Sequence, residues 1–133
     1  MLSSPLPKRW KDLAREIYGG PSGGSIAGVI CKDLTRDGRV DMTLTFYSGG
    51  TAGDVAWVVF RRVGERWQLA LKRLDAYKLT VRVHGGDPVE TQPVYLAGDA
   101  NCCPTGGFDH VRYHWNGKRF VVARAWHTKQ YAP

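Results

Sequence analysis

The chain has 133 residues, a length that suits one domain built around one buried core. Its hydrophobic content of 43%, with five Trp, six Tyr and four Phe, excludes a disordered protein. The net charge of +7 comes from single or paired basic residues, never from a basic run with interleaved aromatic residues, so we expect no specific nucleic-acid partner. No apolar run reaches the roughly 18 residues of a transmembrane helix, so we also expect no transmembrane segment.

The first element that we expect is an amphipathic helix between Pro7 and Tyr18. Its apolar residues recur at i, i+3, i+4 and i+7, which is the pattern of a helix with one buried face. These residues are Trp10, Leu13, Ala14 and Ile17. The segment Gly19-Gly20-Pro21 then predicts the end of the helix.

After this helix, polar and apolar residues alternate with the period of two that β-strands have. The predicted strands cover residues 40–47, 55–61, 66–72, 77–83, 111–115 and 120–122. Asn116-Gly117, between the last two, is the strongest hairpin signal in the chain. We therefore predict a single domain over residues 1–133 with an α+β fold. An N-terminal helix, within residues 1–20, should pack on a curved antiparallel sheet of six to eight strands, within residues 25–125.

The Asp-rich segment 33–41 has oxygen-bearing side chains at loop positions 1, 3, 5 and 9, and Gly38 at position 6. This pattern is the first three quarters of a calcium loop, in which alternate oxygens converge on a hard cation. Position 12 is Leu44 instead of the Glu of an EF-hand, so the segment is more similar to the Asp-rich loops of FG-GAP and VCBS repeats, and calcium binding should be weak. The predicted ligands are Asp33, Thr35, Asp37, the carbonyl of Arg39, and Asp41. The alternative is a hydrogen-bonded Asx turn.

The glycine-rich segment 48–54 lies between two predicted strands. It lacks the Gly-Lys-Ser/Thr ending and the following helix of a phosphate-binding loop. We therefore interpret it as a long hairpin loop.

Strand alternation places His110, Arg112 and His114 together on the face opposite to the core. Two imidazoles and a guanidinium could cleave a phosphodiester by general acid–base catalysis, with the guanidinium holding the phosphate. No carboxylate partner for either histidine can be identified from the sequence. The alternative is an ordinary solvent-exposed face, which we favour.

Cys102 and Cys103 are neighbours in the loop 98–107, where free thiols would be exposed to oxidation. Such a pair indicates an oxidising compartment. We expect a disulfide from Cys31 to Cys102 or Cys103, because adjacent Cα atoms lie about 3.8 Å apart and ordinary disulfides span about 4.4–6.8 Å. The alternatives are three reduced cysteines in a cytosolic protein, or a zinc site, for which the ligand spacing is unsuitable.

The run AGDANCCPTGGFDHVRYHWNGKRFVV resembles the C-terminal signature of the actinobacterial LppP/LprE lipoprotein family, in which an Asn-Cys-Cys-Pro loop precedes a final hairpin. The similarity extends back through DLTRDGRVDMTLTFYSGGTAGDVAWVVFRR and covers about residues 30–123. The resemblance implies a small bacterial protein of the extracellular space or the cell envelope, whose leader is absent from this sequence. It implies no defined biochemical role.

We therefore expect a non-enzymatic module that binds an unknown envelope or extracellular ligand through its exposed loops 48–54 and 98–107, with a weak calcium loop. The alternative is a small basic ribonuclease-like hydrolase that uses His110, Arg112 and His114. A third reading is a purely structural domain whose Asp-rich loop is vestigial.

Overall fold

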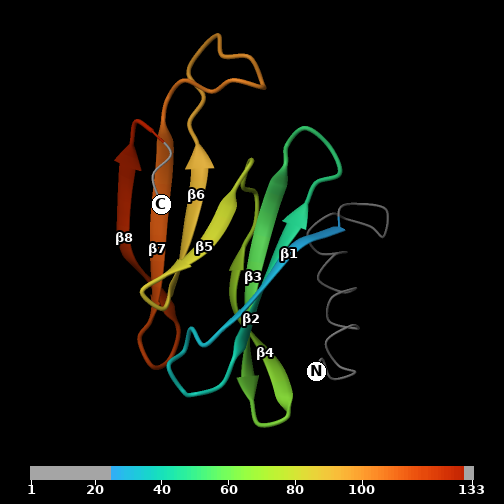
Figure 1. Cartoon of the computed structure of the whole chain (residues 1–133), viewed down its shortest axis with the longest axis vertical. Helices are drawn as coiled ribbons and strands as arrows, with labels where there is room; N and C mark the ends of the chain where they lie inside the picture. Colours follow the sequence, from blue (N-terminus) through green and yellow to red (C-terminus); the bar gives the residue numbers. More distant parts are fainter. Residues whose placement is uncertain (1–24, 131–133) are drawn as a thin grey trace.

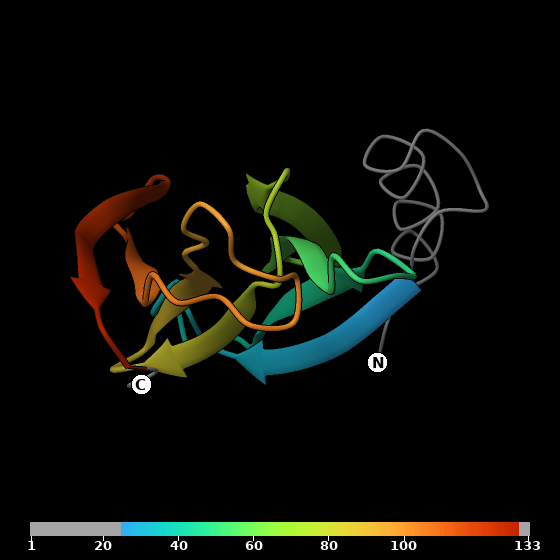
Figure 2. The same ribbon diagram turned by 90° about the horizontal axis from the view of Figure 1, so that it is seen from above.

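The computed structural model describes residues 25–130, which form eight strands in two four-stranded antiparallel sheets (Figure 1). The first sheet contains, in order, β1 (Ser25–Lys32), β2 (Asp41–Tyr47), β3 (Asp54–Val63) and β4 (Arg66–Arg73). The second contains β5 (Thr80–His84), β6 (Asp87–Pro93), β7 (Phe108–Trp115) and β8 (Phe120–Thr128). The second sheet, coloured yellow to red, lies beside the first in both views (Figure 2).

The predicted α+β class is wrong, because every regular element between residues 25 and 130 is a strand. The single curved sheet is also wrong, since the eight strands divide equally between two sheets. The helix expected over residues 7–18 lies outside the described residues. The described part of the chain is therefore all-β.

The two sheets separate at residues 74–79, between β4 and β5. Asp75 and Lys78 have left-handed backbone conformations, with φ of 60° and 49°, so this segment does not continue as a strand. The amide of Ala76 donates instead to the carbonyl of Val55, at 2.9 Å, near the start of β3. Strand β5 therefore begins away from the edge of β4 and starts a new sheet.

Within residues 25–130 the hydrophobic core consists of two clusters on opposite faces of the first sheet. The cluster between the sheets contains Leu34, Trp57, Val59, Ala76, Leu79, Tyr113, Trp115 and Phe120. The other contains Met42, Leu44, Phe46, Ala56, Val58, Phe60 and Trp67. Strand β3 contributes to both clusters, which explains why its sequence is a continuous apolar run. Trp57 and Tyr113 meet edge to face across the sheets, with ring centroids 5.6 Å apart.

A buried carboxylate, Glu90 of β6, also connects the two sheets. Its Oε1 accepts a hydrogen bond from Trp57 Nε1 at 2.7 Å, and Arg73 donates to both of its oxygens at 3.2 Å. Gln92 Nε2 donates to Oε2 at 2.9 Å. Because a buried charge is costly unless it is paired and hydrogen-bonded, these contacts fix β6 against the first sheet. Because successive side chains of a strand point to opposite faces, the residues on either side of Glu90 then point toward the outer face of the second sheet.

Candidate anion-binding site

Three arginines lie in one transverse row on the outer face of the second sheet. The strand register pairs Arg82 of β5 with Val89, Val89 with Arg112 of β7, and Arg112 with Arg124 of β8. Their neighbours along β5 and β7 are apolar residues that pack into the core, so alternation directs the arginines outward. Since neighbouring strands lie about 4.8 Å apart, three guanidiniums gather within the width of four strands.

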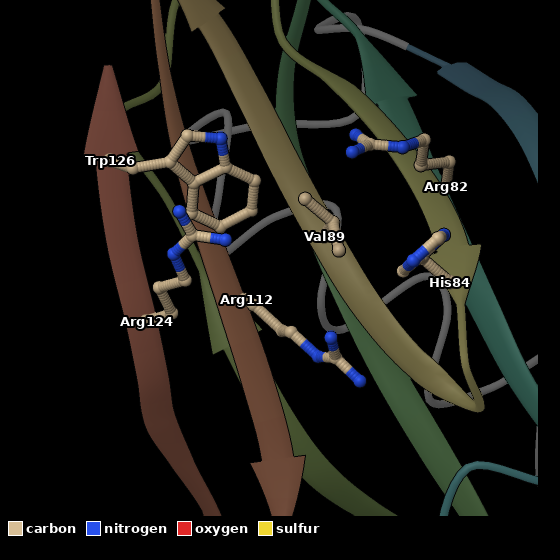
Figure 3. A pocket seen from close by; sticks show the side chains of 6 residues that line it. All are labelled: Arg82, His84, Val89, Arg112, Arg124 and Trp126. Carbon is tan, nitrogen blue, oxygen red and sulfur yellow. The ribbon is translucent and has the colours of Figure 1, made fainter. Parts of the chain in front are cut away.

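These side chains line a pocket of about 180 Å³, together with His84 and Trp126. Figure 3 shows Arg82 and His84 on one side, Arg124 and Trp126 on the other, and Val89 between them. Liquid water occupies about 30 Å³ per molecule, so the pocket has the volume of about six waters. It is smaller than the roughly 300–1,000 Å³ of typical drug-sized sites, and it suits a small polar group.

Asp87 is a buried carboxylate beside this pocket. Its oxygens accept hydrogen bonds from Arg112 Nε at 2.8 Å and from Arg36 Nη1 at 3.2 Å, and His114 Nδ1 lies at 3.0 Å. Burial acts to raise the pKa of Asp87, but the hydrogen bonds from Arg112, His114 and Arg36 outweigh it and lower the pKa below its ordinary value. One carboxylate therefore serves two guanidiniums and an imidazole.

The pocket carries an excess of positive charge. Arg124 lies directly opposite Arg112 in the ladder, an arrangement in which like charges destabilise a sheet. Within residues 25–130 neither Arg82 nor Arg124 forms an ion pair. Arg124 stacks over the ring of Trp126, 4.6 Å from its centroid. The arrangement can attract and hold an anion.

His110 lies in the next row of the sheet and is only 1% exposed. Its Nδ1 and Nε2 each lie 2.8 Å from a threonine hydroxyl, those of Thr91 and Thr128. Its ring stacks on Trp126, with centroids 4.9 Å apart. Burial, and then the charge of Arg82, lower the pKa of His110. This side chain supports Trp126 as a neutral group and does not face solvent.

The three residues predicted to share an outer face therefore have different environments. His114 is partly exposed and contacts Asp87, the carboxylate partner that the sequence did not reveal. His110 is buried, and four residues along a strand separate the two histidines by about 13 Å. The structure does not bring both imidazoles to one phosphodiester.

The carboxylates of the Asp-rich loop bind the backbone of the loop itself. Asp41 Oδ2 accepts hydrogen bonds from the amides of Leu34 (2.7 Å) and Thr35 (2.9 Å) and from the Thr35 hydroxyl (3.1 Å). Burial raises the pKa of Asp41 despite these bonds. Asp33 accepts from the amide of Gly38 at 2.9 Å.

Further along the loop, Asp37 accepts from the amide of Arg39 at 2.9 Å, and its carboxylate lies 4.0 Å from Arg61. No group of three or more His, Cys, Asp or Glu side chains in the described range is arranged to hold a metal ion. The geometry is that of the Asx-turn alternative, and calcium binding stays a prediction. The loop also carries Arg36, at φ 58°, toward Asp87.

The disulfide in the structure joins Cys102 to Cys103, whose Cα atoms are 3.8 Å apart. Cys31 is an exposed free cysteine in β1 of the first sheet, whereas the Cys-Cys loop connects β6 and β7 of the second. The structure therefore contains a disulfide between the two neighbouring cysteines instead of the expected disulfide from Cys31. The loop is closed in addition by Asp99, which accepts from the amides of Leu96 and Thr105 at 2.8 Å.

The segment 48–54 connects β2 and β3 as a hairpin loop, as predicted. No helix in the described residues is long and apolar enough to cross a membrane. Comparisons of the chain with models of protein families, with curated proteins and with solved structures found no match. The resemblance to the LppP/LprE family stays a prediction from the sequence.

Proposed function

We propose that this protein is a binding module that holds a small tetrahedral oxyanion, such as a phosphate or sulfate group, on the outer face of its second sheet. The observation that supports this function is the row of Arg82, Arg112 and Arg124 around one pocket. Guanidiniums bind such anions through charge-assisted hydrogen bonds, often two at a time. The ligand would also relieve the repulsion between Arg112 and Arg124.

This proposal moves the binding surface away from the loops 48–54 and 98–107 that the sequence favoured. The location that we propose remains outside the cell or in the cell envelope. The exposed Cys102–Cys103 disulfide supports such a location, because disulfides persist in oxidising compartments.

The hydrolase alternative has less support. Its mechanism needs two available imidazoles, and both ring nitrogens of His110 contact threonine hydroxyls in a buried position. Asp87 could orient His114, but two arginines share the same carboxylate. RNA turnover that disappears in His114→Ala would favour the hydrolase over the binding module.

Isothermal titration calorimetry with inorganic phosphate and with sulfate, at low ionic strength, tests the proposed function. We expect binding that weakens with added salt, and a loss of about tenfold or more in Arg82→Gln and in Arg124→Gln, since each removes a charge-assisted contact. The matched control is Arg66→Gln, an exposed arginine of β4 in the first sheet.

The control removes the same charge at a distance from the pocket, so its affinity should stay close to that of the wild type. Circular dichroism and thermal unfolding show whether each variant keeps the fold. Equal weakening in all three variants would mean a general charge effect, and unchanged affinity in the pocket variants would contradict the proposed site.

A further inference from the structure

On the basis of the proposed function, we infer that the ligand of this pocket is a phosphate monoester, bound through its terminal dianionic phosphate. A phosphate diester, a sulfate ester and a carboxylate are the anions to be distinguished from it. The charge of the lining groups and the arrangement of the three guanidiniums favour the monoester, and the size of the pocket is compatible with its phosphate group.

The charge around the pocket favours a dianion. Asp87 is the carboxylate next to the lining residues, and it pairs both with Arg112, which lines the pocket, and with Arg36, which does not. With four arginines and one carboxylate, the group of Arg36, Arg82, Arg112, Arg124 and Asp87 therefore keeps a net charge of about +3, and Arg82 and Arg124 have no carboxylate partner among the described residues. A phosphate monoester carries about −1.5 to −2 near neutral pH, whereas a diester or a sulfate ester carries a single charge. Coulomb attraction grows with the charge of the ligand.

The arrangement of the guanidiniums favours three terminal oxygens. Arg82, Arg112 and Arg124 reach the pocket from three different strands around Val89 (Figure 3). A guanidinium has five N–H donors, so Arg112 can hold Asp87 through Nε and still offer its Nη groups. A monoester presents one terminal oxygen to each guanidinium, whereas a diester or a carboxylate presents only two.

The pocket is large enough for a phosphate group but too small for a drug-sized carrier. A volume of about 180 Å³, that of about six waters, accommodates a phosphate group together with a few water molecules. The ester oxygen is the one without a guanidinium partner, so the proposal places it and the carrier on the side of the pocket that faces away from the three arginines. The site recognises the phosphate, and the carrier can be a small soluble molecule or a lipid headgroup with the same terminal group.

The experiment compares three probes at pH 7.5 by calorimetry: ethyl phosphate, ethyl sulfate and diethyl phosphate. Ethyl sulfate keeps three terminal oxygens and loses one charge, and diethyl phosphate loses a terminal oxygen as well. We expect ethyl phosphate to bind about tenfold or more tightly than either of the others, and this preference to disappear in Arg124→Gln but not in Arg66→Gln.

Equal affinity for ethyl phosphate and for either monoanion overturns the inference. If inorganic phosphate still binds in that case, the proposed anion site stands and only its selectivity is wrong. A second arm identifies the carrier by sedimentation with phosphatidylcholine vesicles that contain phosphatidic acid, a monoester, or phosphatidylglycerol, a diester. If the protein sediments with the phosphatidic acid vesicles and not with the phosphatidylglycerol vesicles, the ligand is a lipid headgroup. If it sediments with neither but binds ethyl phosphate, the ligand is a soluble molecule. Both results support the monoester.

Discussion

Asp87 receives contacts from Arg36, Arg112 and His114, which come from a loop of the first half of the chain and from β7. Such a shared carboxylate orients the arginine that lines the pocket without neutralising the pocket as a whole. Two glycines, at φ 59° and 82°, form the turn before Asp87. A Cβ atom at Gly85 would lie 3.1 Å from Arg112 Nη2, and one at Gly86 would lie 3.2 Å from Arg36 Nη2. The turn thus leaves room for both guanidiniums.

At the same scale, Glu90 supports a stability prediction. Glu90→Ala removes the acceptor of Trp57 Nε1 and of Arg73 and leaves the buried Trp57 donor unpaired, while Arg73, with 35% of its side chain exposed, can be solvated instead. Leaving a buried donor without an acceptor costs about 1–3 kcal/mol. We expect a loss of this size in the free energy of unfolding, measured by urea denaturation.

The control for this prediction is Glu65→Ala, in the exposed turn between β3 and β4, which should change stability by less than about 0.5 kcal/mol. Similar losses in the two variants would show that the Glu90 contacts contribute little to the packing of the sheets.

At the scale of elements, the sequence predicted the strands with clear alternation and missed the others. Strand β1 was missed because Ala27 and Gly28 interrupt its apolar pattern, and β6 because its polar centre is bounded by Pro88 and Pro93. Strand β4 was found, but a bulge opposite β3 places Trp67 and Leu71 in different core clusters instead of on one face.

The Asp-rich loop carries the second prediction. A calcium ion would have to displace the backbone amides that Asp33, Asp37 and Asp41 already bind. We therefore expect the same thermal midpoint in EDTA and in millimolar calcium, both for the wild type and for Asp37→Asn. A calcium-dependent rise of the midpoint in the wild type that is lost in Asp37→Asn would establish the calcium loop, because a ligand that binds only the folded state stabilises it.

At the scale of the whole molecule, the two sheets have different tasks. The first has apolar clusters on both faces, whereas the second packs one face into the core and presents polar rows on the other. The sequence predicted the outward face of β7, since alternation is local. It did not predict that Arg82 and Arg124 would flank Arg112, because the register between strands depends on bulges and turns. One such bulge lies between β7 and β8, after Arg112.

Acid should destabilise the whole fold in two steps. The lowered pKa of His110 means that the unfolded chain takes up a proton, near the ordinary value of 6.5, before the folded protein does. Its contribution to stability is therefore complete above that value and is lost as the pH falls below it. Asp87, whose pKa is lowered from 3.8, stabilises the fold above that value, and this contribution is lost at lower pH. Asp41 affects the stability in the opposite sense: burial raises its pKa, so protonation of this group at low pH favours the folded state.

The first of these steps can be measured by urea unfolding between pH 5 and 7.5. We expect the free energy of unfolding of the wild type to fall on acidification, by up to about 1.4 kcal/mol per pH unit for one titrating histidine. His110→Gln removes the titrating group and should flatten this dependence, while the exposed His84→Gln should keep it. The same slope in His110→Gln as in the wild type would show that another group is responsible and that His110 is not held neutral beside Trp126.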